Sequence, residues 1–161
     1  IIYRNKSKTV NFEQLFKFRL RCKAKHIDFY VGNNLKLMNA LKADGLYISA
    51  HNKKLSLSKI RNTRFKIIGS AHNYKELDVK KKQGCTSFIY SRLFKTKYDY
   101  KPGFLGIIRF NLLKLASKKD LVPLGGINYD NLNKLNLVNT NSFVLMSEIK
   151  KKPAKIFSRL F

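Results

Sequence analysis

The chain has 161 residues and a formal net charge of +25, because 34 lysines and arginines face only nine acidic residues. This length predicts a single domain over residues 1–161. No apolar run approaches the ~20 residues of a membrane-spanning helix and no signal peptide is recognisable, so we expect no helical membrane span. The positive charge makes a polyanion, such as a nucleic acid, a partner to consider.

The basic residues are mostly lysines spread along the whole chain, without an arginine-rich tail, a zinc-finger spacing or an aromatic RNA-binding motif. Lysine, asparagine and isoleucine are all abundant, which an AT-rich coding sequence produces without selection for a partner. Non-specific polyanion binding is therefore an alternative function that rests on net charge alone. Cys22 and Cys85 have no CxxC spacing, and such sparse cysteine usage is typical of a reducing cytoplasm.

Short apolar strands alternate with amphipathic helical stretches along the chain. The predicted strands are residues 1–4, 27–31, 45–48, 65–69, 86–90, 121–124 and 142–145. The predicted helices or helical turns are residues 12–24, 35–41, 56–62, 74–83, 107–117, 129–137 and a C-terminal helix ending at residue 161. A long basic loop is predicted over residues 92–106.

This alternation predicts an α/β fold with a parallel sheet. Seven strands, each followed by a helix or helical turn, are one fewer than the eight that close a (β/α)8 TIM barrel. Because residues 1–4 already have the pattern of a strand, we predict a barrel that lacks its first β/α unit.

Two adjacent glycines follow the predicted strand at residues 121–124. Gly125 and Gly126 permit a tight turn and a close approach of the backbone to a ligand. The next predicted strand runs directly into Met146 and Ser147. Main-chain amides after two consecutive strands are typical of the phosphate site of a (β/α)8 barrel. The alternative is that the two glycines only form a turn.

Several motifs, taken in order, resemble the thiamine phosphate synthase/TenI family. They cover the chain from end to end, and their common order is more specific than any one of them. The corresponding stretches are IIYRNK at 1–6, GN at 32–33, ADGLYISAHN at 43–52, SAH at 70–72, FKTK at 94–97, PLGGI at 123–127 and FVLMSEI at 143–149.

The resemblance implies an enzyme of thiamine biosynthesis that couples a hydroxymethylpyrimidine diphosphate to a thiazole phosphate, with magnesium, and releases pyrophosphate. It implies that the thiazole phosphate binds main-chain amides of Gly125, Gly126, Met146 and Ser147. Further substrate contacts are assigned to Ser70 and Thr96. The leaving pyrophosphate is assigned to the side chains of Arg4, Lys6 and Lys97, since fixed cations stabilise developing negative charge. The alternative for each base is an exposed surface residue.

The chain departs from the family at the implied metal site. The two magnesium carboxylates of the family map onto Asn33 and Asn52. An amide oxygen can coordinate Mg²⁺, but this ion depends on carboxylates and substrate phosphates for its affinity. Ile2 and Tyr47 replace a family glutamine and histidine. The pyrimidine diphosphate side has thus changed while the thiazole phosphate side is retained, as in TenI-like members.

His72 completes the predicted site. It fits the family's S-x-H motif after the predicted strand at residues 65–69, and an imidazole can take up and release a proton near neutral pH. The alternative is a surface or capping histidine. We therefore expect synthase-like coupling, with a TenI-like thiazole tautomerase or a non-catalytic thiazole phosphate binder as alternatives. The cysteine usage indicates a cytoplasmic protein, and the resemblance implies that it can form homo-oligomers.

Overall fold

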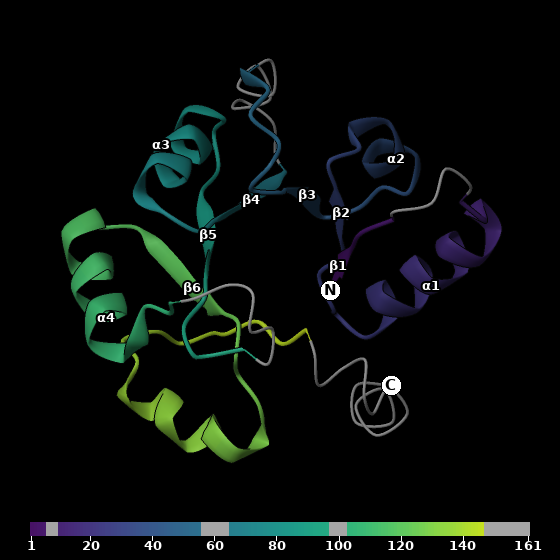
Figure 1. The fold of residues 1–161 in the computed structure, drawn as a ribbon. Helices are drawn as coiled ribbons and strands as arrows, with labels where there is room; N and C mark the ends of the chain where they lie inside the picture. The colour runs from purple at the N-terminus through teal and green to yellow at the C-terminus, as the bar shows by residue number, and fades with distance from the viewer. Residues whose placement is uncertain (6–9, 56–64, 97–102, 147–161) are drawn as a thin grey trace.

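A computed structural model describes residues 1–5, 10–55, 65–96 and 103–146 (Figure 1). The helical turn predicted at residues 56–62 and the predicted C-terminal helix lie outside the described residues. Within the described part of the chain, no helix combines the length and apolar character needed to cross a membrane.

The described strands form one parallel sheet in which every strand neighbours the next one along the chain. The six strands are β1 (Ile2–Tyr3), β2 (Tyr30–Gly32), β3 (Gly45–Ile48), β4 (Lys66–Ala71), β5 (Ser87–Ser91) and β6 (Asp120–Leu124). The strand predicted at residues 142–145 is reduced to one parallel bridge between Val144 and Leu124. The main-chain N–H of Val144 donates to the carbonyl oxygen of Pro123 over 3.0 Å. The sheet curves into a half-barrel (Figure 1).

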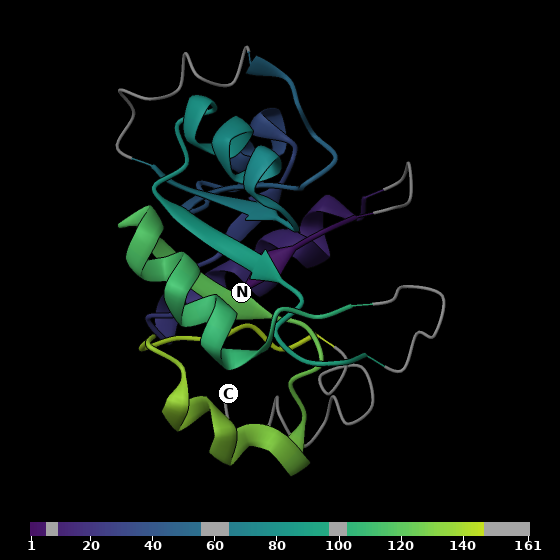
Figure 2. The same ribbon diagram turned by 60° about the vertical axis from the view of Figure 1, so that its left-hand side comes forward.

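In the described residues, a helix follows each strand except β3, and the helices lie on the outer face of the curved sheet (Figures 1 and 2). They are α1 (Phe12–Ala24), α2 (Leu35–Ala40), α3 (Tyr74–Lys82), α4 (Gly106–Ser117) and the 3-10 helix η2 (Tyr129–Leu137). Four of the five begin after an asparagine whose side-chain oxygen accepts a main-chain N–H, the interaction that favours asparagine at this position. These caps are Asn11, Asn34, Asn73 and Asn128.

Two apolar clusters hold the layers together. The larger one lies between the sheet and the helices and includes Phe29, Phe88 and Phe110, all essentially inaccessible. The smaller one consists of Tyr30, Tyr47, Ile89 and Val122, from β2, β3, β5 and β6. Alternate residues of a strand point to opposite faces, so the smaller cluster fills the concave face of the sheet as it does inside a barrel.

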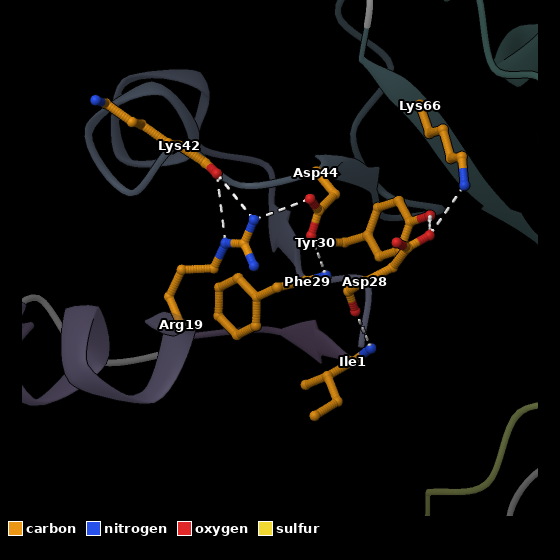
Figure 3. Close-up of polar contacts among 8 residues, drawn as sticks. All are labelled: Ile1, Arg19, Asp28, Phe29, Tyr30, Lys42, Asp44 and Lys66. Carbon is orange, nitrogen blue, oxygen red and sulfur yellow. Dashed lines mark hydrogen bonds and ion pairs between the residues drawn. The ribbon is translucent and has the colours of Figure 1, made fainter. Parts of the chain in front are cut away.

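Aspartates fix the N-terminal ends of the strands (Figure 3). Asp44, just before β3, accepts hydrogen bonds from the Arg19 guanidinium at 2.9 Å and from the main-chain N–H of Phe29 at 2.7 Å. Asp28, just before β2, accepts from the Tyr30 hydroxyl at 3.1 Å and from the Lys66 ammonium at 3.0 Å. Burial, followed by the hydrogen bond to Asp28, raises the pKa of Tyr30.

Candidate functional site

The C-terminal ends of the strands meet at the opposite edge of the sheet and bring the predicted site residues together. Arg4 follows β1, Asn33 follows β2, Asn52 follows β3, Ser70 lies near the end of β4, and His72 comes directly after it. Lys6, Lys97 and Ser147, also predicted at the site, lie outside the described residues.

The predicted glycine turn follows β6 and lies against the segment after β5. Gly125 and Gly126 have φ values of +97° and +72°, in the region that favours glycine. A Cβ on Gly126 would lie 2.5 Å from the carbonyl oxygen of Phe94, and one on Gly125 would lie 3.0 Å from Cγ of Arg92. The glycines are therefore required both by their backbone conformation and by the segment that packs on them.

Main-chain donors at this turn are not used by the rest of the described chain. Neither Gly125 nor Gly126 donates its N–H in any hydrogen bond between described residues. The parallel bridge from Leu124 to Val144 places Met146, which is 49% exposed, at the same edge. An anion at this edge could thus bind backbone N–H groups without displacing a described hydrogen bond.

Arg92 lies next to the predicted site, although its sequence context predicts only a basic loop. It directly follows β5, its stem lies over Gly125, and its Nη1 donates to Thr96 Oγ1 over 2.9 Å. The Arg92 stem therefore lies against the predicted phosphate turn, and its guanidinium contacts the predicted substrate residue Thr96. Its position two residues after the predicted strand at 86–90 is the signal that could have identified it.

Arg4 and Ser70 are joined through Tyr47 on the concave face. The Arg4 guanidinium carbon lies 5.5 Å from the centre of the Tyr47 ring, within the range of a cation–π contact. The Tyr47 hydroxyl donates to Ser70 Oγ over 2.9 Å, and both residues are buried. This arrangement holds a cation at the edge and fixes the Ser70 hydroxyl beneath it.

His72 forms a pair with Glu76 at the start of α3. Its Nδ1 lies 3.0 Å from Glu76 Oε2, and the same oxygen accepts the main-chain N–H of His72 at 2.8 Å. Burial raises the pKa of Glu76, but these hydrogen bonds from His72 outweigh burial and leave the pKa lowered. Glu76 was missed in the sequence, where its i+4 spacing from His72 at a helix start was the available signal. A carboxylate on one ring nitrogen is the arrangement that orients an acid/base histidine.

The residues at the implied metal position do not fit Mg²⁺. Asn33 Oδ1 already accepts from the Ser49 N–H at 3.0 Å and from Asn52 Nδ2 at 3.2 Å, while Asn52 Oδ1 accepts from the Lys54 N–H at 3.1 Å. No carboxylate joins these amides, and the described residues hold no group of three or more His, Cys, Asp or Glu side chains placed to bind a metal. Mg²⁺ requires carboxylate oxygens or phosphates that this donor set lacks.

With this geometry in place, the comparisons with known proteins decide the family. The family model for thiamine monophosphate synthase matches residues 1–149. The chain belongs to the thiamine monophosphate synthase family. The resemblance found in the sequence motifs is thereby confirmed.

Two curated relatives carry the description thiamine-phosphate synthase. The one from Prochlorococcus marinus is 27% identical over 129 residues, which are 80% of this chain and 37% of that protein. The one from Methanococcus vannielii is 25% identical over 132 residues, 81% of this chain and 63% of that protein. The chain thus spans less than two thirds of the length of either relative.

Solved structures share the fold. Thiamine phosphate pyrophosphorylase from Pyrococcus furiosus superposes with a TM-score of 0.68 at 17% identity, over 96% of this chain and 81% of that one. A structure described as native KDPGal gives a TM-score of 0.63 at 12% identity, over 88% of this chain and 67% of that one. These likenesses show that the chain shares the α/β fold of the Pyrococcus furiosus protein, here described as a six-stranded parallel half-barrel.

Proposed function

We propose that this protein binds a thiazole phosphate at the Gly125–Gly126 turn and couples it to hydroxymethylpyrimidine diphosphate, as in thiamine phosphate synthesis. The observation that carries the proposal is the glycine turn itself, where two main-chain N–H groups that donate to no other described residue lie beside the Arg92 stem. A phosphate monoester there would receive main-chain hydrogen bonds and a guanidinium, the combination that binds phosphate in proteins.

We assign the pyrimidine diphosphate to the part of the C-terminal edge around β1, away from the Gly125–Gly126 turn. The thiazole nitrogen forms a bond to the methylene carbon of the pyrimidine as the bond from that carbon to the diphosphate oxygen breaks. Pyrophosphate leaves with the electron pair, and fixed cations stabilise its growing negative charge. We assign this role to Arg4, which directly follows β1, and to Lys6 and Lys97, which lie outside the described residues.

We further infer that the half-barrel corresponds to seven of the eight strands of a (β/α)8 barrel, with Val144 marking the last of them. The sequential parallel order and the filled concave face support this inference. A further β/α unit pairing along β1 would complete such a barrel.

Titration calorimetry tests the binding proposal. We expect the thiazole phosphate to bind and its unphosphorylated alcohol to bind at least about tenfold more weakly, since charged hydrogen bonds to the phosphate are lost. Addition of the pyrimidine diphosphate should then yield thiamine phosphate, measured by chromatography. No heat with the thiazole phosphate would contradict the proposal.

Binding of DNA that weakens steeply with salt would instead favour the polyanion alternative. Light scattering on the same sample tests for a homo-oligomer.

The His72–Glu76 pair favours a second candidate, a TenI-like thiazole tautomerase. In this reaction His72 would take a proton from one ring atom and return it to another, so that no other reactant is consumed. We expect His72→Gln to abolish isomerisation and Glu76→Gln to alter its pH profile. His26→Gln, at an exposed histidine ahead of β2, is the matched control. Full isomerase activity in the His72→Gln variant would exclude this role.

A further inference from the structure

The segment after β3 is held from two sides by side chains that form no ion pair within the described chain. One side is the amide cluster of Asn33, Ser49 and Asn52 at the C-terminal edge. The other is Lys80 and Gln83, at the end of α3 and fully buried beneath the segment. We refer to these five residues together as the amide latch.

The upper side of the latch joins β2 to the segment after β3. Asn33 Nδ2 donates to Ser49 Oγ over 2.9 Å, and Asn33 Oδ1 accepts from the Ser49 N–H and from Asn52 Nδ2. Asn33 itself has a φ of +55°, a conformation that asparagine tolerates better than most residues. Its side chain thus uses both donor and acceptor groups to close this part of the edge.

The lower side contains a lysine with 0% exposure. The Lys80 ammonium donates to the main-chain carbonyl oxygen of Asn52 at 2.6 Å and to Gln83 Oε1 at 2.9 Å. Gln83 Nε2 donates to the carbonyl oxygens of Asn52 and Lys54 at 2.9 and 3.1 Å. Burial lowers the pKa of Lys80. Neutral oxygens therefore surround a buried cation directly behind Asn52.

We propose that the amide latch replaces a divalent cation at this position, with the Lys80 ammonium as the fixed positive charge. A cation on the Asn33 and Asn52 oxygens would have to displace the hydrogen bonds of the latch. It would also lie on the side chain of Asn52, whose main-chain carbonyl oxygen already binds the buried Lys80 ammonium, and nearby like charges repel. Ligand binding at this edge is therefore independent of magnesium. This independence rests on the proposed function, whereas the replacement of the cation by the amide latch does not.

Thermal unfolding with and without millimolar Mg²⁺ tests the latch without any ligand. We expect no shift of the unmodified chain, and a magnesium-dependent rise in Tm for Asn33→Asp with Asn52→Asp, which restores two carboxylates. Asn39→Asp with Asn133→Asp makes the same charge change at exposed positions and should show no such rise. A magnesium-dependent rise in the unmodified chain that disappears in Asn33→Ala would overturn the proposal.

The role of Lys80 is tested by Mg²⁺ calorimetry on the same background. Lys80→Met added to the two aspartate changes should tighten Mg²⁺ binding by at least about tenfold, because it removes the competing charge. An unchanged Mg²⁺ affinity would show that Lys80 is not the replacing cation. Where the triple variant fails to fold, the unmodified chain still decides: tight Mg²⁺ binding to it overturns the proposal.

Thiazole phosphate binding, measured in Mg²⁺ and in chelator, distinguishes failure of the latch proposal from failure of the proposed function. If the thiazole phosphate binds equally in Mg²⁺ and in chelator, both stand. If it binds only in Mg²⁺, the latch proposal is wrong and the proposed function survives. If it binds in neither while the Tm results hold, the proposed function fails and the latch remains.

Discussion

The two edges of the sheet have opposite chemistry. At the N-terminal edge, Asp28 and Asp44 stand just before two strands with their carboxylates hydrogen-bonded (Figure 3). Asp120, the first residue of β6, accepts a hydrogen bond from the Ser87 hydroxyl. The C-terminal edge instead carries Arg4 and Arg92, together with neutral amides and glycine N–H groups, and its carboxylate Glu76 is hydrogen-bonded to His72. The chain thus places three of its nine acidic residues where they stabilise the fold and leaves the other edge attractive to anions.

This contrast gives a physical reason for the asparagines at the two positions where the resemblance implies magnesium carboxylates. A negative charge at the C-terminal edge helps only if a divalent cation is bound there, and otherwise it repels phosphates. Asn33 and Asn52 avoid that repulsion, while aspartates at the other edge hold strand ends and a buried arginine. The contrast predicts that changes at the N-terminal edge mainly affect stability, whereas changes at the C-terminal edge mainly affect ligand binding.

The largest stability effect should come from Asp44→Ala. It would leave the Arg19 side chain, which is only 7% exposed, without its carboxylate. We expect a loss of about 3 kcal/mol in the free energy of unfolding, measured in urea, because a buried charge loses its partner. Glu13→Ala breaks an exposed pair with Lys17 and should cost under about 1 kcal/mol. Equal losses in the two variants would break the contrast.

Gly126→Ala should come next and affect both stability and binding. The left-handed backbone and the approach to Phe94 predict a loss of about 1–3 kcal/mol, with weaker thiazole phosphate binding. Gly103→Ala has a similar positive φ, and no described atom lies within 4 Å of its Cβ, so it isolates the backbone cost. If both variants lose the same stability in urea and bind equally well, the contact with Phe94 is unimportant.

Arg92→Gln should weaken ligand binding without a large stability change. We expect about a tenfold loss of affinity for the thiazole phosphate in calorimetry, from loss of a charged hydrogen bond, and no change for the unphosphorylated alcohol. Arg109→Gln, at an exposed position on α4, provides the control. A loss that is equal for both ligands would assign Arg92 to packing on Gly125 rather than to the phosphate.

The smallest effect should be a pH dependence from Asp28. Its hydrogen bond from Lys66 holds its pKa below the usual 3.8, so its stabilisation is present above that pH and disappears as pH falls through the lowered value. The side chain is 50% exposed, and we expect a contribution under about 1 kcal/mol. Comparison of acid unfolding between the unmodified chain and Asp28→Asn measures it. If the two proteins unfold identically as the pH falls, Asp28 makes no such contribution to stability.

Much of the fold could be predicted because the hydrophobic pattern is local. The helix at 12–24 has the predicted bounds, and the strands start and end within a few residues of their predicted positions. The strand at 142–145 was overestimated, since its apolar pattern says nothing of how many ladder partners it finds. Residues 129–137 form a 3-10 helix, consistent with a segment rich in asparagine and aspartate, which compete with the α-helical backbone.

The candidate site was less predictable because its contacts join distant segments. Colinear motifs could bring Arg4, Ser70 and Gly126 to one edge, since parallel strands end together. They could not show that Asn33 and Asn52 bond to each other. Lys80 lies in a run of three lysines that reads as a solvated surface, and only the packing of α3 reveals its burial.

The cation over Tyr47 also gives this protein a built-in optical signal. The chain has eight tyrosines and no tryptophan, so its near-ultraviolet fluorescence comes from tyrosine alone. A phosphate ligand that draws Arg4 away from the Tyr47 ring would change the emission of that residue. The difference in emission between the unmodified chain and Tyr47→Phe then isolates the signal of Tyr47 on the concave face of the sheet, without an attached dye.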